Sequence, residues 1–168
     1  MTSTTELLGD SFDRIRGLVR GVLDGADRDK LVFRVDPQAN TIAWLVWHLA
    51  RIQDDHIADA MGVEQLWPAW ADRFDLPFSL GATGYGQSAD DVAAVDVDAS
   101  LLRGYFDAVA DRTGTWIDTL SDADLDRIVD EDWDPPVTLA VRLVSVISDD
   151  LQHAGQANFI AGVFDRSK

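Results

Sequence analysis

The chain has 168 residues and no cysteine, so it forms no disulfide bond and any thiol chemistry needs a thiol from outside. Its formal net charge of −16 disfavours nucleic acid and anionic membranes as partners, because both carry negative phosphate groups. The first residues lack the pattern of a signal peptide, and the longest apolar run, Ile42 to Trp47, is too short to cross a bilayer. We therefore expect a single cytoplasmic domain spanning 1–168, with no nucleic-acid and no membrane partner.

Two amphipathic helices are predicted in the first third of the chain. From Thr5 to about Ala26, apolar residues recur at steps of three and four, which is the spacing of one buried helix face. The second helix starts after Pro37, with Asn40 or Thr41 as its N-cap, and ends at Gly62. Its first half is apolar on all sides, so this helix is expected in the middle of a bundle, with His48 enclosed.

The rest of the chain adds a long connection and two more helices. Residues 62–98 are rich in tryptophan, proline and glycine and show no sustained helical spacing, so they predict an ordered crossover. A third helix is predicted from Asp98 or Ala99 to Leu120, then a helical turn at Ser121. A fourth helix is expected from its cap Thr138 to about Phe164. These elements predict an all-α fold, a four-helix bundle with a crossover between its second and third helices.

The predicted fourth helix carries an unusual charged stretch, ISDDLQHAGQ, at 147–156. On a helical wheel Asp150 points into the apolar stripe, whereas Asp149 and His153 lie on its flank. An exposed Asp–His pair four residues apart contributes only about 0.2–0.5 kcal/mol and needs no function. A buried unpaired carboxylate costs several kcal/mol, however, so Asp150 and His153 should have a partner across the bundle. The other enclosed polar side chain is His48.

A divalent cation would account for these positions. His48, Asp149 and His153 make a set of two histidines and one carboxylate, which leaves coordination sites open for another ligand. That donor set suits zinc, iron, manganese or nickel. The alternative is a hydrogen-bonded polar core without metal, which would show direct Asp–His contacts of hydrogen-bond length.

Other polar and aromatic residues favour ordinary structural roles. His56 is expected at a solvated helix end, with Asp55 beside it as a weak candidate for substrate contact. Surface pairing is expected for the arginines that could instead bind carboxylates of a thiol cofactor, namely Arg51, Arg73 and Arg142. The GATGYG segment at 81–86 predicts turns only, and the aromatics of the crossover predict either core packing or a pocket wall.

Two blocks of the sequence resemble the DinB-like superfamily, in particular its branch related to mycothiol-dependent maleylpyruvate isomerases and other bacterial thiol transferases. NTIAWLVWHLARIQDDH is similar to the second helix of that family, where a histidine supplies the first metal ligand, here His48. SDDLQHAGQ is similar to its fourth-helix block, whose two ligands are four residues apart, here Asp149 and His153. Many members have histidine where this chain has Asp149.

The resemblance implies a cation, with zinc or nickel expected, that binds the sulfur of a small thiol such as mycothiol and holds it as a thiolate. The expected activity is a metal-dependent thiol S-transferase or thiol-dependent isomerase acting on an electrophilic substrate, and family analogy also implies a homodimer. Hydrolysis of a small substrate stays open, with Asp150 as the catalytic base. So does a non-enzymatic, stress-related bundle that binds a metal or another ligand.

Overall fold

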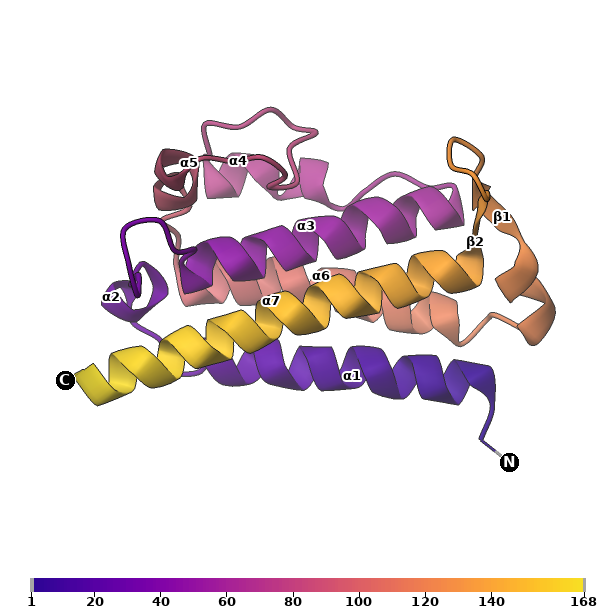
Figure 1. Cartoon of the computed structure of the whole chain (residues 1–168), viewed down its shortest axis with the longest axis horizontal. Helices are drawn as coiled ribbons and strands as arrows, with labels where there is room; N and C mark the ends of the chain where they lie inside the picture. The colour runs from indigo at the N-terminus through magenta and orange to yellow at the C-terminus, as the bar shows by residue number, and fades with distance from the viewer. Residues whose placement is uncertain (1, 168) are drawn as a thin grey trace.

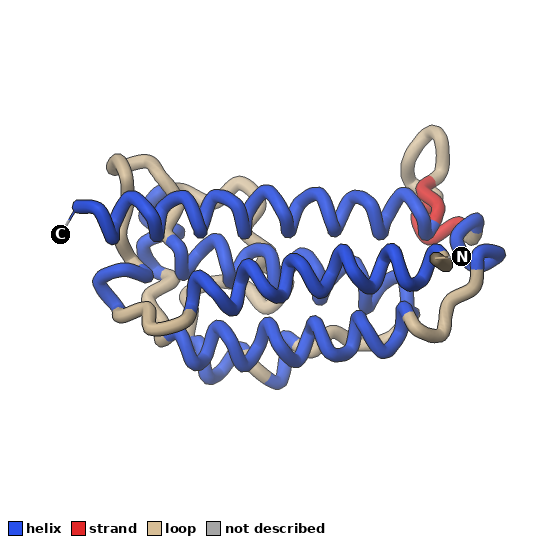
Figure 2. The backbone as a smooth tube through the Cα atoms, turned by 90° about the horizontal axis from the view of Figure 1, so that it is seen from below, coloured by secondary structure: helices blue, strands red, loops and turns tan. Residues whose placement is uncertain are grey.

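The computed structural model describes residues 2–167. The two ends of the predicted domain, Met1 and Lys168, lie outside the described residues. Four long helices run side by side (Figures 1 and 2): α1 (Thr4–Leu23), α3 (Ile42–Met61), α6 (Ala99–Ile117) and α7 (Leu139–Ser167). Helices α1 and α3 each pack against both α6 and α7, so the apolar faces of all four meet in one core. The predicted all-α bundle is confirmed.

The boundaries of α3 follow from local chemistry. Thr41 is its N-cap, since the Thr41 side chain accepts a hydrogen bond of 3.1 Å from the backbone N–H of Trp44. At the other end Gly62 has a φ of 70°, a left-handed conformation that glycine adopts without steric cost. Most of α3 is buried on every side. Among residues 2–167, no helix combines the length and the apolar character needed to span a membrane.

The crossover covers the side of α3 that faces away from α1. It contains a 3-10 helix, η1 (Trp67–Ala69), and two short helices, α4 (Ala71–Phe74) and α5 (Ala89–Ala94). Figure 1 shows these elements above α3, as expected for an ordered crossover. Helix α2 (Arg28–Leu31), which was not predicted, is a single helical turn whose cap Asp27 accepts a hydrogen bond from the N–H of Lys30.

The connection from α6 to α7 forms a small hairpin. After η2 (Asp122–Asp126), strand β1 (Ile128–Asp130) pairs antiparallel with β2 (Val137–Thr138). The helical turn expected at Ser121 is present, but the strands were not predicted, because runs of two and three residues carry no period. Thr138 accepts from the N–H of Val141 at 3.3 Å, and α7 extends three residues beyond Phe164.

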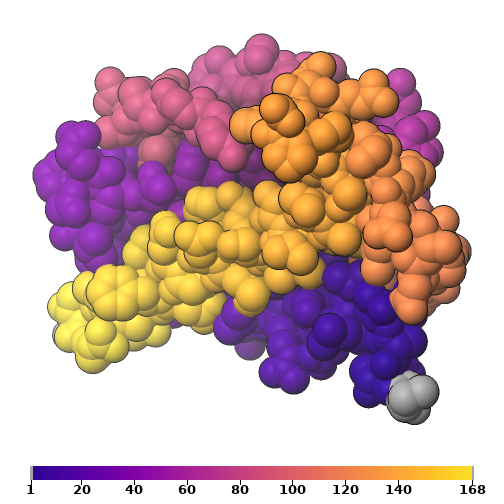
Figure 3. All heavy atoms as spheres, turned by 45° about the vertical axis from the view of Figure 1, so that its right-hand side comes forward, coloured from indigo at the N-terminus to yellow at the C-terminus, as the bar shows by residue number. Residues whose placement is uncertain are grey.

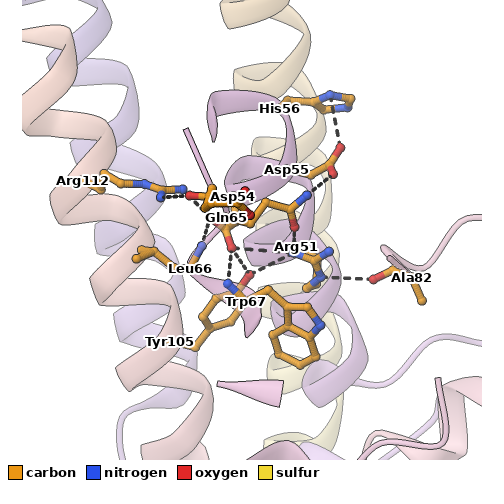
Figure 4. A network of polar contacts seen from close by, with 11 residues as sticks. Arg51, Asp54, Asp55, His56, Gln65, Leu66, Trp67, Ala82, Tyr105 and Arg112 are labelled. Carbon is orange, nitrogen blue, oxygen red and sulfur yellow. Dashed lines mark hydrogen bonds and ion pairs between the residues drawn. The ribbon is translucent and has the colours of Figure 1, made fainter. Parts of the chain in front are cut away.

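A buried polar network fastens the crossover to α3 (Figure 4). Asp54 accepts from the N–H groups of Leu66 and Trp67 at 2.9 and 2.8 Å. Arg51 is fully buried, so the surface pairing predicted for it is wrong. The Arg51 Nε donates to the carbonyl of Ala82 at 3.1 Å, which holds the segment that follows Ala82 against α3.

Candidate metal centre

Helices α3 and α7 bring His48, Asp149 and His153 together. One ligand atom from each residue lies within 4.8 Å of the other two, and the centres of the imidazole rings are 4.5 Å apart. His48 is 4% exposed, whereas Asp149 and His153 are partly exposed on the flank of α7. The structure therefore assembles the predicted trio at a position that is both enclosed and accessible from one side.

His48 is oriented by the crossover. Its Nδ1 lies 2.5 Å from the carbonyl oxygen of Thr83, and a carbonyl only accepts, so Nδ1 carries the proton. The lone pair of the imidazole is then on Nε2, which lies 4.0 Å from Oδ2 of Asp149. Burial lowers the pKa of His48, although the bond to Thr83 opposes this, so the neutral ring that ligates metals is favoured.

The segment at 81–86, for which the sequence predicted turns only, also packs against His48. Gly84 has a φ of 112°, and a methyl group on it would overlap with Nδ1 of His48 and lie 3.0 Å from Cζ2 of Trp44. The ring of Trp44 stacks on His48 with centroids 4.7 Å apart, and its Nε1 donates to Gln87 at 2.6 Å. Only glycine allows the backbone to approach this closely.

His153 is oriented by its own helix. Its Nδ1 lies 2.8 Å from the backbone oxygen of Asp149 and 3.1 Å from the Asp149 Oδ2, so Nδ1 carries a proton and, in the neutral ring, Nε2 has the lone pair. Burial lowers the pKa of His153, but the hydrogen bond and charge of Asp149 outweigh burial and raise it overall. His48 makes no such bond to Asp149, so the trio is not a closed hydrogen-bonded network.

These features fit a divalent cation. Both histidines donate from Nδ1 to a backbone carbonyl, an arrangement that fixes the tautomer of metal-ligating histidines and presents Nε2 to the ion. A carboxylate of Asp149 completes a set of two nitrogens and one oxygen, which borderline ions such as zinc and nickel accept.

Asp150 has no partner across the bundle, contrary to the sequence prediction. Its carboxyl group is fully buried, and neither oxygen makes a hydrogen bond within the described chain. Burial, and secondarily the charge of Asp149, raise the pKa of Asp150 well above its usual range. The neutral acid is therefore favoured, which is the wrong protonation state for a base that must accept a proton.

We predict that Asp150→Ala makes the metal-free protein more stable at pH 7, by about 1–3 kcal/mol, because a buried carboxyl without partners is removed. The folded state retains a proton on Asp150 that the unfolded chain releases above a pKa of about 3.9, so wild type loses stability as the pH rises. The advantage of the variant should grow between pH 4 and pH 7 in urea titrations. The exposed Asp13→Ala is the control, and a destabilised Asp150→Ala would contradict the prediction.

The remaining predicted residues occupy other places. His56 is half-buried and bonded to Arg142 at 2.8 Å, so the expected solvated helix end is wrong. Arg142 makes an ion pair, as predicted, with Asp130 at 2.7 Å. Trp67 packs on Trp47 and Tyr105 in the core. Two exposed aromatics line one pocket, and the sequence pattern did not predict a site role for either: Tyr85, whose ring centre lies 6.1 Å from that of His48, and Trp133 in the hairpin.

Comparisons with known proteins agree with this architecture. The family model described as the DinB superfamily matches residues 11–157. The crystal structure of a conserved protein from Enterococcus faecalis resembles this chain with a TM-score of 0.87 and 28% sequence identity, over 96% of each chain. The comparison with curated proteins gives no significant match. A family match over most of its length, on a bundle of the same topology, shows that this chain belongs to the DinB superfamily.

Proposed function

We propose that this protein is a metal-dependent enzyme that transfers a low-molecular-weight thiol, such as mycothiol, to a small electrophile, or uses that thiol to isomerise it. One observation carries the proposal: two histidines with fixed tautomers and a carboxylate lie together beside a pocket, in a chain without cysteine. The resemblance of the two ligand-bearing blocks to mycothiol-dependent enzymes supports the same chemistry.

The residues of the site have three roles in this proposal: they hold the metal, orient the histidines and cover His48. A zinc or nickel ion held by His48, Asp149 and His153 supplies positive charge that lowers the pKa of a coordinating thiol. Thr83 and the backbone of Asp149 keep both imidazoles in the ligating tautomer. Gly84 lies against Nδ1 of His48 and Trp44 stacks on its ring, so both cover His48.

Hydrolysis is the less favoured chemistry for this site. It needs a base that takes a proton from water, and the residue available on α7 is Asp150. Burial favours the neutral form of Asp150, and Asp150 lies outside the group of three ligands, so it is poorly suited to accept a proton from metal-bound water.

A non-enzymatic bundle is the second candidate, and one contact favours it. The 3.1 Å separation of His153 Nδ1 and Asp149 Oδ2 is a hydrogen bond, as expected for a polar core without metal. In that case the protein would bind a ligand, for example under stress, without converting it.

The test is a conjugation assay with metal-loaded protein and 1-chloro-2,4-dinitrobenzene, together with mycothiol, bacillithiol or glutathione in separate reactions. We expect conjugate formation that depends on one of these thiols and is lost in His153→Ala, while the exposed control Asp13→Ala keeps wild-type activity. Turnover without thiol would favour hydrolysis. Absence of turnover with every thiol would favour the binding protein.

A further inference from the structure

A pocket of about 580 Å³ lies between the crossover and the hairpin, over the first turns of α7. Figure 3 shows the end of the crossover (pink) and the hairpin (orange) meeting above α7. The wall of the pocket combines two exposed aromatic residues, Tyr85 and Trp133, with a polar group made of His56, Arg142 and Asp130. The metal ligands are not part of this wall, so the groups that would contact a ligand in the pocket differ from those that would hold the metal.

The pocket lies next to the metal centre and extends from there toward the hairpin. Tyr85 contacts the ring of His48 edge-on at 6.1 Å, and Ser145, in the pocket wall, is one helical turn before Asp149. His56 follows His48 by eight residues, which places it about 12 Å further along α3. A small molecule can therefore have one end near the metal ligands and the other near His56.

The polar end of the pocket presents an uncharged hydrogen-bond donor. The Arg142 guanidinium lies 2.8 Å from Nδ1 of His56, and because a guanidinium only donates, Nδ1 accepts and the proton is on Nε2. Burial and the nearby charge of Arg142 lower the pKa of His56, which keeps the ring neutral. Among residues 2–167, Nε2 of His56 has no hydrogen-bond partner, so it is available to a ligand.

The charges around this end disfavour an anion. Asp130 lies 2.7 Å from Arg142 and neutralises it, and the carboxylate of Asp55 is 3.7 Å from His56. A ligand carboxylate would meet these acidic groups in a chain of net charge −16. A neutral oxygen acceptor avoids that repulsion, and the exposed rings of Tyr85 and Trp133, 78% and 67% exposed, offer flat apolar surface to a planar ligand.

We propose that this pocket binds a neutral, planar carbonyl compound, with its ring against Tyr85 and Trp133 and its oxygen accepting a hydrogen bond from His56. The inference deepens the proposed function and rests on it for the part the ligand plays, since the ligand would be the electrophile that receives the thiol. Binding itself requires neither metal nor thiol.

Three probes with the same ring system test the proposal on metal-free protein by isothermal titration calorimetry. They are 2-acetylnaphthalene, a neutral ketone, 2-naphthoate, an anion, and 2-ethylnaphthalene, which has no acceptor. The ketone should bind about 2- to 10-fold more tightly than the ethyl compound, the worth of one hydrogen bond. It should also bind more tightly than naphthoate. Tighter binding of naphthoate would overturn the proposal by making the polar end an anion site.

Variants locate the bound probe. His56→Phe keeps an aromatic ring but no donor, so the preference for the ketone over the ethyl compound should disappear. Trp133→Ala should weaken all three probes, and because Trp133 is exposed this variant does not depend on a repacked core. Phe159→Ala is the matched control, since Phe159 is similarly exposed, at 64%, but lines a different pocket. An effect of Phe159→Ala without one of Trp133→Ala would overturn the proposal.

The outcome separates this inference from the proposed function. Ketone binding that depends on His56, combined with no thiol conjugation, would contradict the transferase alone. Thiol conjugation without ketone binding would contradict this pocket alone.

Discussion

His153→Ala is expected to remove stoichiometric metal binding, lowering the affinity for zinc by more than about a hundredfold. Removing a residue that only forms a hydrogen bond to a metal ligand lowers the metal affinity by about 10- to 100-fold, and this change removes a ligand itself. His153 is only partly buried, so the variant should fold. Metal content of dialysed protein, and competition with a chromogenic chelator, measure the effect.

His56→Ala is the matched control for metal binding, because it removes a histidine from the same bundle that lies outside the group of three ligands. It should keep the wild-type metal content. Full metal content in His153→Ala would show that the ion binds elsewhere. No binding to wild type in excess zinc and nickel would favour the hydrogen-bonded core.

Asp54→Ala is expected to destabilise the fold by about 3–5 kcal/mol, because it leaves buried cationic groups without their counter-charge. Asp54 is fully buried and forms an ion pair with Arg112, and the guanidinium of Arg51 is 3.7 Å away. Its Oδ2 also accepts from the hydroxyl of Tyr105 at 2.9 Å. Burial and the charge of Asp54 raise the pKa of Tyr105 well above its usual value, so this hydroxyl stays a donor.

Urea titration measures the loss, with Asp59→Ala as control. Asp59 is exposed on the same helix, so its removal should change the free energy of unfolding by less than about 0.5 kcal/mol. Asp54→Ala should also weaken zinc binding, because Arg51 fastens Ala82 and thereby the carbonyl of Thr83 that orients His48. An Asp54→Ala protein as stable as the control would show that the network does not hold the crossover.

The sequence by itself determined the features that depend on neighbours along the chain. Hydrophobic steps of three and four predict α1, α3, α6 and α7, because a helix repeats its faces locally. Thr41 and Gly62 mark the ends of α3 for the same reason, since a cap bonds within one turn. Asp149 and His153 are four residues apart on one helix, so their proximity is also local.

Only the tertiary structure decided which distant groups meet. Thr83 is 35 residues from the His48 that it orients, and His56 and Arg142 are 86 residues apart. No periodicity relates such pairs, because their contact depends on how the crossover and hairpin pack on the bundle. The burial of Arg51 and Asp54 also depends on the tertiary structure. From the sequence alone a charged side chain is predicted to be exposed, because the counter-charge that allows its burial is identified only in the fold.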